Sequence, residues 1–231
     1  MIRMGFQTMS GWVTRATRIS RGSGRLPKRL QPRRAPTQSR SIQTVEAVVT
    51  AATRILVEKK WEGLSMQDVA TLAGVSPGTL YQYFPDKHAL VAELVERVSL
   101  REVEFQLSRF ASLPEGEGLL GRIDHLVRGT LEFQRREGRL MRVLLECLPH
   151  LGRHALLVER VAGLASVMRG MLEERRAEVA HDDLDLVVHV IVNAVHSLTH
   201  DGVLARPASL DDETLAREIR RLIAGYVRPA R

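Results

Sequence analysis

The sequence is poor in several features that would point to particular protein classes. Cys147 is the one cysteine among 231 residues, which excludes an intramolecular disulfide and any zinc site built from several cysteines. No G-x-S-x-G, P-loop or H-E-x-x-H motif occurs, so we expect no enzyme, no metal site and no cofactor. Apolar runs stay well short of the roughly 20 residues that cross a bilayer. We therefore expect a soluble, cytoplasmic protein without a membrane partner.

Acidic residues are missing from the first 40 positions, where ten Lys or Arg residues occur. The rest of the chain holds 24 basic and 27 acidic residues, so the net charge of +7 comes from this segment. Because the segment is also rich in Pro and Gly and poor in apolar residues, we predict a disordered basic arm over residues 1–41. Such an arm could contact phosphate backbones or be inert. It could also reflect a start site placed too far upstream, since Met4 and Met9 follow Met1, or an organelle transit peptide.

No strand-like alternation of any length follows the arm. Instead, apolar residues recur at the three-and-four spacing that lines one face of a helix. In the first helix these are Ile42, Val45, Val48, Val49, Ala52, Ile55 and Leu56. We therefore expect an all-α fold, with a three-helix DNA-binding domain over residues 42–87 and a larger helical domain over residues 88–231.

Two short helices are predicted after the first long one. Ser65 is a good N-cap for the first of them, and Gly74 is a typical stop signal. Ser76 is a good N-cap for the second, Pro77 suits its first position, and Pro85 ends it. Two short helices joined by a tight turn make a helix-turn-helix, whose second helix enters a DNA major groove.

The second short helix combines a narrow apolar edge, Leu80 and Phe84, with an outward surface of unusual composition. Tyrosine hydroxyls reach phosphate oxygens, and Thr and Gln side chains reach base edges. Lys87 adds a point charge for a phosphate just beyond this helix. The alternative is that the tyrosines pack against neighbouring helices and the glycines only make turns. The predicted recognition surface consists of Pro77, Gly78, Thr79, Tyr81, Gln82 and Tyr83.

Residues 45–94 carry the pattern GLS...VA..AGVS.GTLY.YF..K..L, and over this stretch the sequence resembles the DNA-binding domain of the TetR family of transcriptional regulators. The resemblance implies a three-helix reading head, a fourth helix that links it to a larger helical domain, and a homodimer that is usually a repressor. It implies the same recognition surface, with Ser65 near a phosphate and Lys87 as a phosphate anchor.

Apolar periodicity and its interruptions predict further helices in the C-terminal region. The helix over 184–203 is apolar almost all round, which indicates burial on several sides, most simply against a second subunit. The last helix, over 214–227, would complete a four-helix dimer interface to which each subunit contributes two helices. The predicted dimer interface contains Val188, Ile191, Val195, Leu215, Ile219 and Leu222. The predicted helices span residues 86–113, 119–137, 140–148, 153–179, 184–203 and 214–227, with breaks at Gly138, at Pro149 with Gly152, and at Pro207.

A narrow polar stripe on the 184–203 helix allows several interpretations. It comprises Asp185, His189, Asn193, His196 and His200, at steps of three or four residues. It could face solvent or the rim of an interface, it could line a ligand pocket, or His196 and His200 could bind a metal, although no third ligand is evident. The candidate residues for binding an apolar small molecule are Phe105, Phe133, Met141, His189, Asn193 and His196. For the apolar members, core packing is the better interpretation. Cys147 could be a redox sensor, but buried packing fits it better.

These observations favour a homodimeric repressor that binds a palindromic operator in double-stranded DNA and is released by a small-molecule ligand. A second hypothesis is a similar DNA binder without such an inducer, either of nucleoid type or regulated by a protein partner. The third, an enzyme in the helical body, lacks any supporting motif.

Overall fold

The computed structural model describes residues 39–114, 116–151, 165–204 and 212–228, and every secondary-structure element in these ranges is a helix. The all-α prediction is confirmed for this part of the chain. No helix in it is long and apolar enough to cross a membrane. The predicted basic arm lies outside the described residues except for its last three positions, where the first helix has already begun. The start of the predicted 153–179 helix lies outside them as well.

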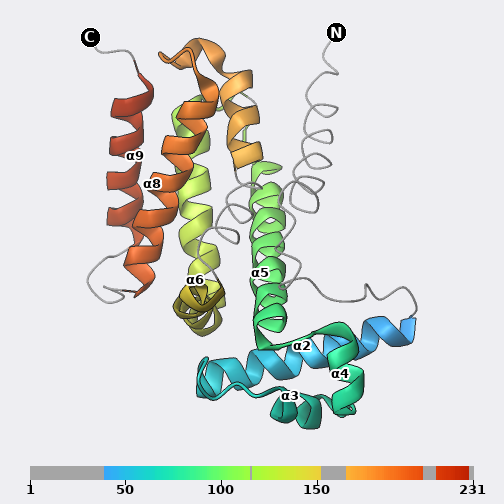
Figure 1. Cartoon of the computed structure of the whole chain (residues 1–231). Coiled ribbons are helices and arrows are strands. Elements are labelled where there is room, and N and C mark those ends of the chain that lie inside the picture. The colour runs from blue at the N-terminus through green and yellow to red at the C-terminus, as the bar shows by residue number, and fades with distance from the viewer. Residues whose placement is uncertain (1–38, 115, 152–164, 205–211, 229–231) are drawn as a thin grey trace. The chain divides into compact units, whose positions relative to one another are not determined.

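The chain divides into two compact units, which are described one at a time. The head unit contains residues 39–99 and 137–151 of the described chain. Three helices begin it: α2 (Ser39–Lys59), α3 (Met66–Ala73) and α4 (Pro77–Tyr83) (Figure 1). The first part of α5 (Lys87–Phe110) and the last part of α6 (Leu119–Leu151) complete it.

Local signals in the head unit set the helix ends. The Ser65 hydroxyl accepts a hydrogen bond from the Asp68 amide at 3.1 Å, and α3 ends at Gly74, whose φ of 68° suits glycine. The Ser76 hydroxyl accepts from the Thr79 amide at 3.1 Å, so α4 starts with a capped turn and Pro77 at its first position. These caps confirm the predicted beginning and end of each short helix.

Apolar side chains from all the elements of the head unit form its core. The apolar face predicted for α2 is buried except at Ile42, which is 46% exposed, so its predicted place on that face is wrong. Leu80 and Phe84 are the buried edge of α4. Phe84 has extended backbone angles, φ −119° and ψ 110°, which end α4 before Pro85. The Asp86 carboxylate then accepts a hydrogen bond from the Ala89 amide at 2.9 Å and caps α5. The short recognition helix is thus held at both ends and along one side.

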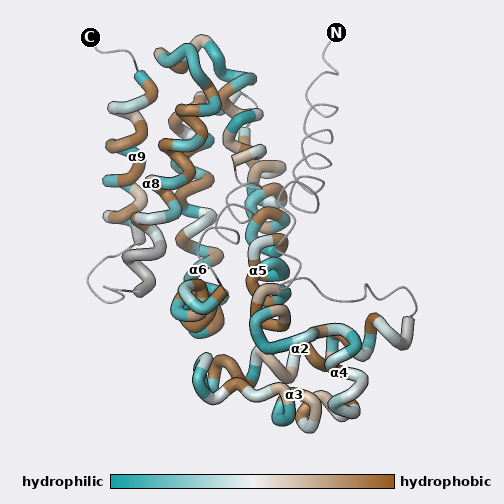
Figure 2. Tube along the Cα trace, viewed as in Figure 1, coloured by the Kyte–Doolittle hydropathy of each residue, from teal (hydrophilic) through white to brown (hydrophobic). Residues whose placement is uncertain are grey.

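The body unit contains residues 100–114, 116–136, 165–204 and 212–228 of the described chain. It comprises the remainder of α5 and α6, a helical segment over 165–174, a short 3₁₀ turn η2 (Arg176–Glu178), α8 (Leu184–Leu204) and α9 (Asp212–Val227). The last two helices pack side by side, and α8 is apolar along much of its length (Figure 2). They run antiparallel, because the amide of Ala180, just before α8, donates to the carbonyl of Val227 at the end of α9 at 2.9 Å.

The break predicted at Gly138 is confirmed. Gly138 has the non-helical angles φ 35° and ψ −100°, so α6 consists of two helical parts that meet at a kink there. Glycine accepts this conformation because it has no Cβ atom. Pro149 lies inside the last turn and does not stop the helix before Leu151.

Close packing between α5 and α6 in the body unit depends on Gly129. A Cβ atom at this position would lie 2.3 Å from Gln106 Oε1 and 3.0 Å from its Cδ atom. We expect Gly129→Ala to lower the free energy of unfolding by about 1–3 kcal/mol, the usual cost of overpacking, as measured by urea denaturation. In a Gln106→Ala background the same substitution should cost much less, because the colliding amide is gone. Equal costs in both backgrounds would contradict this packing.

Candidate nucleic-acid interface

The outward face of α4 carries most of the predicted recognition surface. Pro77, Gly78 and Gln82 are exposed, and Tyr81 is 44% exposed. Thr79 is half-buried, and its hydroxyl shares a 2.8 Å hydrogen bond with that of Ser76. The structure therefore brings these residues together on one helix face, with the Thr79 hydroxyl held by the cap.

Tyr83 has a different position from the one expected. Its side chain is 8% exposed and packs among the core residues of the head unit. Residues two positions apart on an α-helix point in nearly opposite directions, so an outward Tyr81 turns Tyr83 inward. The predicted place of Tyr83 on the outward surface is wrong, and contact between Tyr83 and DNA stays a prediction.

Ser65 and Lys87 lie at helix starts on either side of α4 in the sequence. Ser65 is exposed, and its hydroxyl is used in the cap of α3. Lys87 is half-buried in the first turn of α5, and its Nζ donates to the carbonyl of Trp61 at 3.4 Å. The same Nζ lies 4.5 Å from the centroid of the Trp61 ring. Sequence reasoning missed this tryptophan because 26 positions separate it from the lysine.

The recognition surface allows a prediction that separates affinity from specificity. Tyr81→Phe removes a hydroxyl expected at a phosphate, so it should weaken binding to all sequences by about 1–3 kcal/mol. Thr79→Ala removes a group expected at a base edge, so it should cost a similar amount and relax preference at one base pair. Titration of labelled duplexes that differ at single positions measures both effects. Unchanged affinity in both variants would contradict the assignment of this face.

The candidate ligand residues are not gathered in one place. Phe105 and Phe133 pack together in the body unit with their ring centroids 5.8 Å apart. Met141 is fully buried but belongs to the head unit. His189 and Asn193 are exposed on α8, where the Asn193 side-chain amide donates to the His189 carbonyl at 2.7 Å.

Buried amide and hydroxyl groups in the body unit were not anticipated from the sequence. The Gln106 amide nitrogen donates to Thr130 Oγ1 at 3.0 Å, and the Gln134 amide nitrogen donates to Thr199 Oγ1 at 3.0 Å. All four side chains are buried, and Gln106 Oε1 and Gln134 Oε1 have no hydrogen-bond partner among the described residues. A sequence signal existed, since Thr130 and Gln134 are four apart on an otherwise apolar helix face. His196, half-buried, contributes its backbone carbonyl, which accepts from the Thr199 hydroxyl at 3.2 Å.

Cys147 lies in the core of the head unit. Burial, assisted by the negative charge of Glu146, raises the pKa of its thiol to about 12. The thiol therefore stays protonated at neutral pH and lacks the reactive thiolate that a redox sensor needs. In the described part of the chain no group of three or more His, Cys, Asp or Glu residues is placed to hold a metal ion.

The residues predicted for the dimer interface divide into two sets. Val188, Ile191, Val195 and Ile219 are buried in the core of the chain's own body unit. Leu215 is half-buried, whereas Leu222 is 55% exposed. Two further leucines on α8 are exposed: Leu186 by 53% and Leu198 by 39%.

The polar stripe on α8 mixes surface and partly buried positions. Asp185 is exposed and forms an ion pair with Arg169, while His189 and Asn193 are exposed on the same helix. His196 is half-buried, and the side chain of His200 lies outside the described residues.

Comparison with known proteins identifies the family. Residues 48–94 match the family model described as bacterial regulatory proteins, tetR family, and residues 121–226 match that described as tetracyclin repressor-like, C-terminal domain. The chain belongs to the TetR family. The resemblance noted in the sequence is thereby confirmed, and the two matches cover both units with models of the same family.

Individual relatives are distant from this TetR-family chain. The HTH-type transcriptional regulator RutR of Escherichia coli is 25% identical over 135 residues, 58% of this chain and 59% of RutR. The match thus spans less than two thirds of the length of that relative. The HTH-type transcriptional repressor BepR of Brucella suis is 23% identical over 157 residues, 63% of this chain and 73% of BepR.

Solved structures share the fold. The fatty acid degradation regulator FadR of Bacillus halodurans has a TM-score of 0.64 and 16% identity, covering 82% of this chain and 97% of FadR. A bacterial regulatory protein of the tetR family from Rhodococcus RHA1 has a TM-score of 0.59 and 15% identity, covering 84% of this chain and all of its own length. At this level of identity the likeness concerns the fold alone.

Proposed function

We propose that this TetR-family protein is a sequence-specific DNA-binding transcriptional regulator that acts as a homodimeric repressor and is released by a small-molecule ligand. The outward face of α4 is the observation that carries the proposal. Its exposed Pro77, Gly78, Tyr81 and Gln82 cover a helix of 7 residues that is capped at its start and anchored by buried Leu80. A helix that recognises bases in a major groove must be rigid and must carry exposed groups that can hydrogen-bond to DNA. The name of BepR, a repressor, supports the proposed direction of regulation.

A dimer is supported by apolar side chains on the outer faces of α8 and α9. Leu186 on α8 is 53% exposed and Leu222 on α9 is 55% exposed, whereas Val187, Ile191 and Ile219 on the same helices are buried. Large apolar side chains exposed on neighbouring helices fit an interface with another chain. We therefore assign the dimer contact to Leu186 and Leu222 together with the exposed polar positions His189 and Asn193 on α8.

A ligand is supported by the unsatisfied groups in the body unit. Buried polar atoms in proteins nearly always have a hydrogen-bond partner, and Gln106 Oε1 and Gln134 Oε1 have none among the described residues. Phe105 and Phe133, which adjoin these glutamines in the sequence, pack together with their ring centroids 5.8 Å apart and supply apolar surface. This combination suits a largely apolar molecule that carries a hydrogen-bond donor, and binding would lower operator affinity if the ligand prefers a conformation that DNA does not.

The test is selection of bound duplexes from a random pool by the purified full-length protein. A dimer with two-fold symmetry should recover a palindrome whose half-site centres lie about 34–36 Å apart, or a multiple of this. Recovery of sequences without any shared site would contradict the proposal. Such an outcome, with a steep dependence of affinity on salt, would favour the alternative of nucleoid-type binding without an inducer.

The basic arm allows a separate prediction. If residues 1–40 contact phosphates, their deletion should flatten the plot of log affinity against log salt by about 0.9 for each phosphate that the arm neutralises, and the selected sequence should stay the same. Filter binding at several salt concentrations measures this slope. An identical slope would mean that the arm takes no part in binding.

A further inference from the structure

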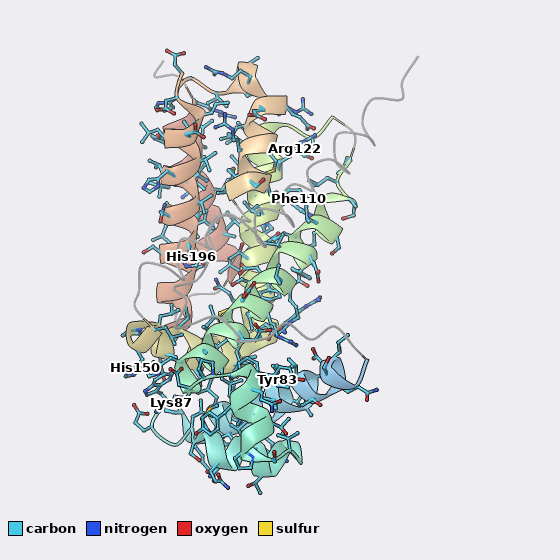
Figure 3. All side chains as sticks on the ribbon, turned by 45° about the vertical axis from the view of Figure 1, so that its right-hand side comes forward. Tyr83, Lys87, Phe110, Arg122, His150 and His196 are labelled. Atoms are coloured by element: carbon cyan, nitrogen blue, oxygen red, sulfur yellow. The ribbon has the colours of Figure 1, made fainter. Side chains whose placement is uncertain are left out.

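The indole of Trp61 is enclosed by side chains from distant parts of the head unit. Trp61 lies in the turn after α2 and is 9% exposed. His150, in the last turn of α6, stacks on it with ring centroids 4.6 Å apart and planes inclined by 2°. His88, in the first turn of α5, meets it edge-on with centroids 5.0 Å apart. Lys87 and His150 are labelled in Figure 3, and each of them contacts the same indole.

The position of Lys87 is not explained by the stability of α5. A cation in the first turn of a helix faces the positive end of the helix dipole, which is unfavourable. Two contacts to Trp61 offset this: Nζ lies 4.5 Å from the ring centroid and 3.4 Å from the backbone oxygen. An ammonium group held in this way loses less side-chain entropy on meeting a phosphate than a freely moving lysine does.

The geometry points to His150 as a positioning residue for DNA binding: its ring supports the Trp61 indole, and the indole supports the Lys87 ammonium at a DNA phosphate. This inference rests on the function proposed above. His150 lies outside the helix-turn-helix in the sequence, on a helix whose first half belongs to the body unit. The phosphate contact thus depends on a side chain from outside the helix-turn-helix.

A second contact between the same elements provides a matched control. Lys60 Nζ lies 3.2 Å from Glu146 Oε2, and both side chains are largely exposed. This ion pair also joins the last part of α6 to the turn after α2, but it involves neither the Trp61 ring nor Lys87. Glu146→Gln therefore weakens the link between the elements without disturbing the stack.

The experiment is a double-mutant cycle on the full-length protein, using a duplex selected by the wild type. Lys87→Ala should weaken binding roughly tenfold near 0.1 M salt and reduce the salt slope by about 0.9, as expected when one phosphate is no longer neutralised. His150→Ala should weaken binding several-fold in the wild type and have almost no effect in the Lys87→Ala background. His150→Phe keeps a flat ring and should bind like the wild type. Glu146→Gln should have the same effect with and without Lys87.

Equal losses of affinity from His150→Ala in both backgrounds would overturn the inference, and so would wild-type affinity of His150→Ala. Thermal unfolding checks that each variant folds. If alanine destabilises the head unit, His150→Leu retains apolar bulk without a stacking plane and takes its place in the cycle. A wild-type protein that selects no sequence would contradict the proposed function itself. If the wild type binds its selected sequence normally but His150→Ala has equal effects in both backgrounds, only the role of His150 is contradicted and the proposed function stands.

Discussion

Ile219→Glu is expected to unfold the body unit rather than to separate two subunits. Ile219 is buried in the core that α9 shares with α6 and α8 within one chain. A carboxylate without a partner at such a position costs about 3–5 kcal/mol, a large share of the 5–15 kcal/mol that stabilises a typical domain. Circular dichroism during urea denaturation should show a strongly reduced midpoint.

Ile219→Val is the matched control for this prediction. It keeps the site apolar and removes one methylene group, so it should cost only about 0.5–1.5 kcal/mol. Val195→Glu should behave like Ile219→Glu, because Val195 is buried in the same core. A folded, stable Ile219→Glu protein would mean that this side chain reaches solvent, contrary to its burial.

Leu222→Glu is expected to have the opposite effect: a folded protein that no longer dimerises. Leu222 is 55% exposed on α9, so a carboxylate there meets water in the isolated subunit. In a symmetric interface the substitution is buried twice, and two uncompensated charges cost several kcal/mol. Light scattering should report a monomer, while circular dichroism without urea should show the helical content of the wild type.

Loss of the dimer should also remove binding to a palindrome. Several kcal/mol corresponds to more than about a hundredfold in affinity, and a single reading head contacts only one half-site. Leu222→Met, which preserves apolar volume, is the control and should bind normally. A Leu222→Glu protein that stays dimeric with full operator affinity would show that the subunits meet on another surface, and Leu186→Glu would then test the outward face of α8 independently.

Several features of this protein follow from short-range sequence alone. The beginning and end of α3 and α4 could be predicted because Ser65, Gly74, Ser76 and Pro77 act on backbone groups a few positions away. The helical periodicity of α2 likewise predicted its buried residues from Val45 to Leu56, although it failed at Ile42, which is exposed. These signals, arranged in the order of the TetR pattern, were enough for the all-α fold and the family.

The directions of individual side chains depended on tertiary packing. Tyr81 and Tyr83 both suit DNA contact by residue type, but a helix with one anchored edge at Leu80 turns only the first outward. Gln106 and Gln134 became a buried polar pair only through the helices packed around them.

Periodicity by itself predicted that α8 is buried on several sides, but only the tertiary structure decided which of its residues are buried within the chain. The sequence of an apolar face does not identify the surface that packs against it, because the hydrophobic effect is non-directional and scales with the area removed from water. The structure assigns Val188, Ile191 and Val195 to the chain's own core, and it exposes Leu186 and Leu198. Lys87 and Trp61 likewise meet across 26 positions, and His150 joins them from α6, because folding of the head unit brings their helices together. Local sequence therefore determined the helices and their ends. Packing between helices decided which side chains lie in the core and which lie on the exposed surface.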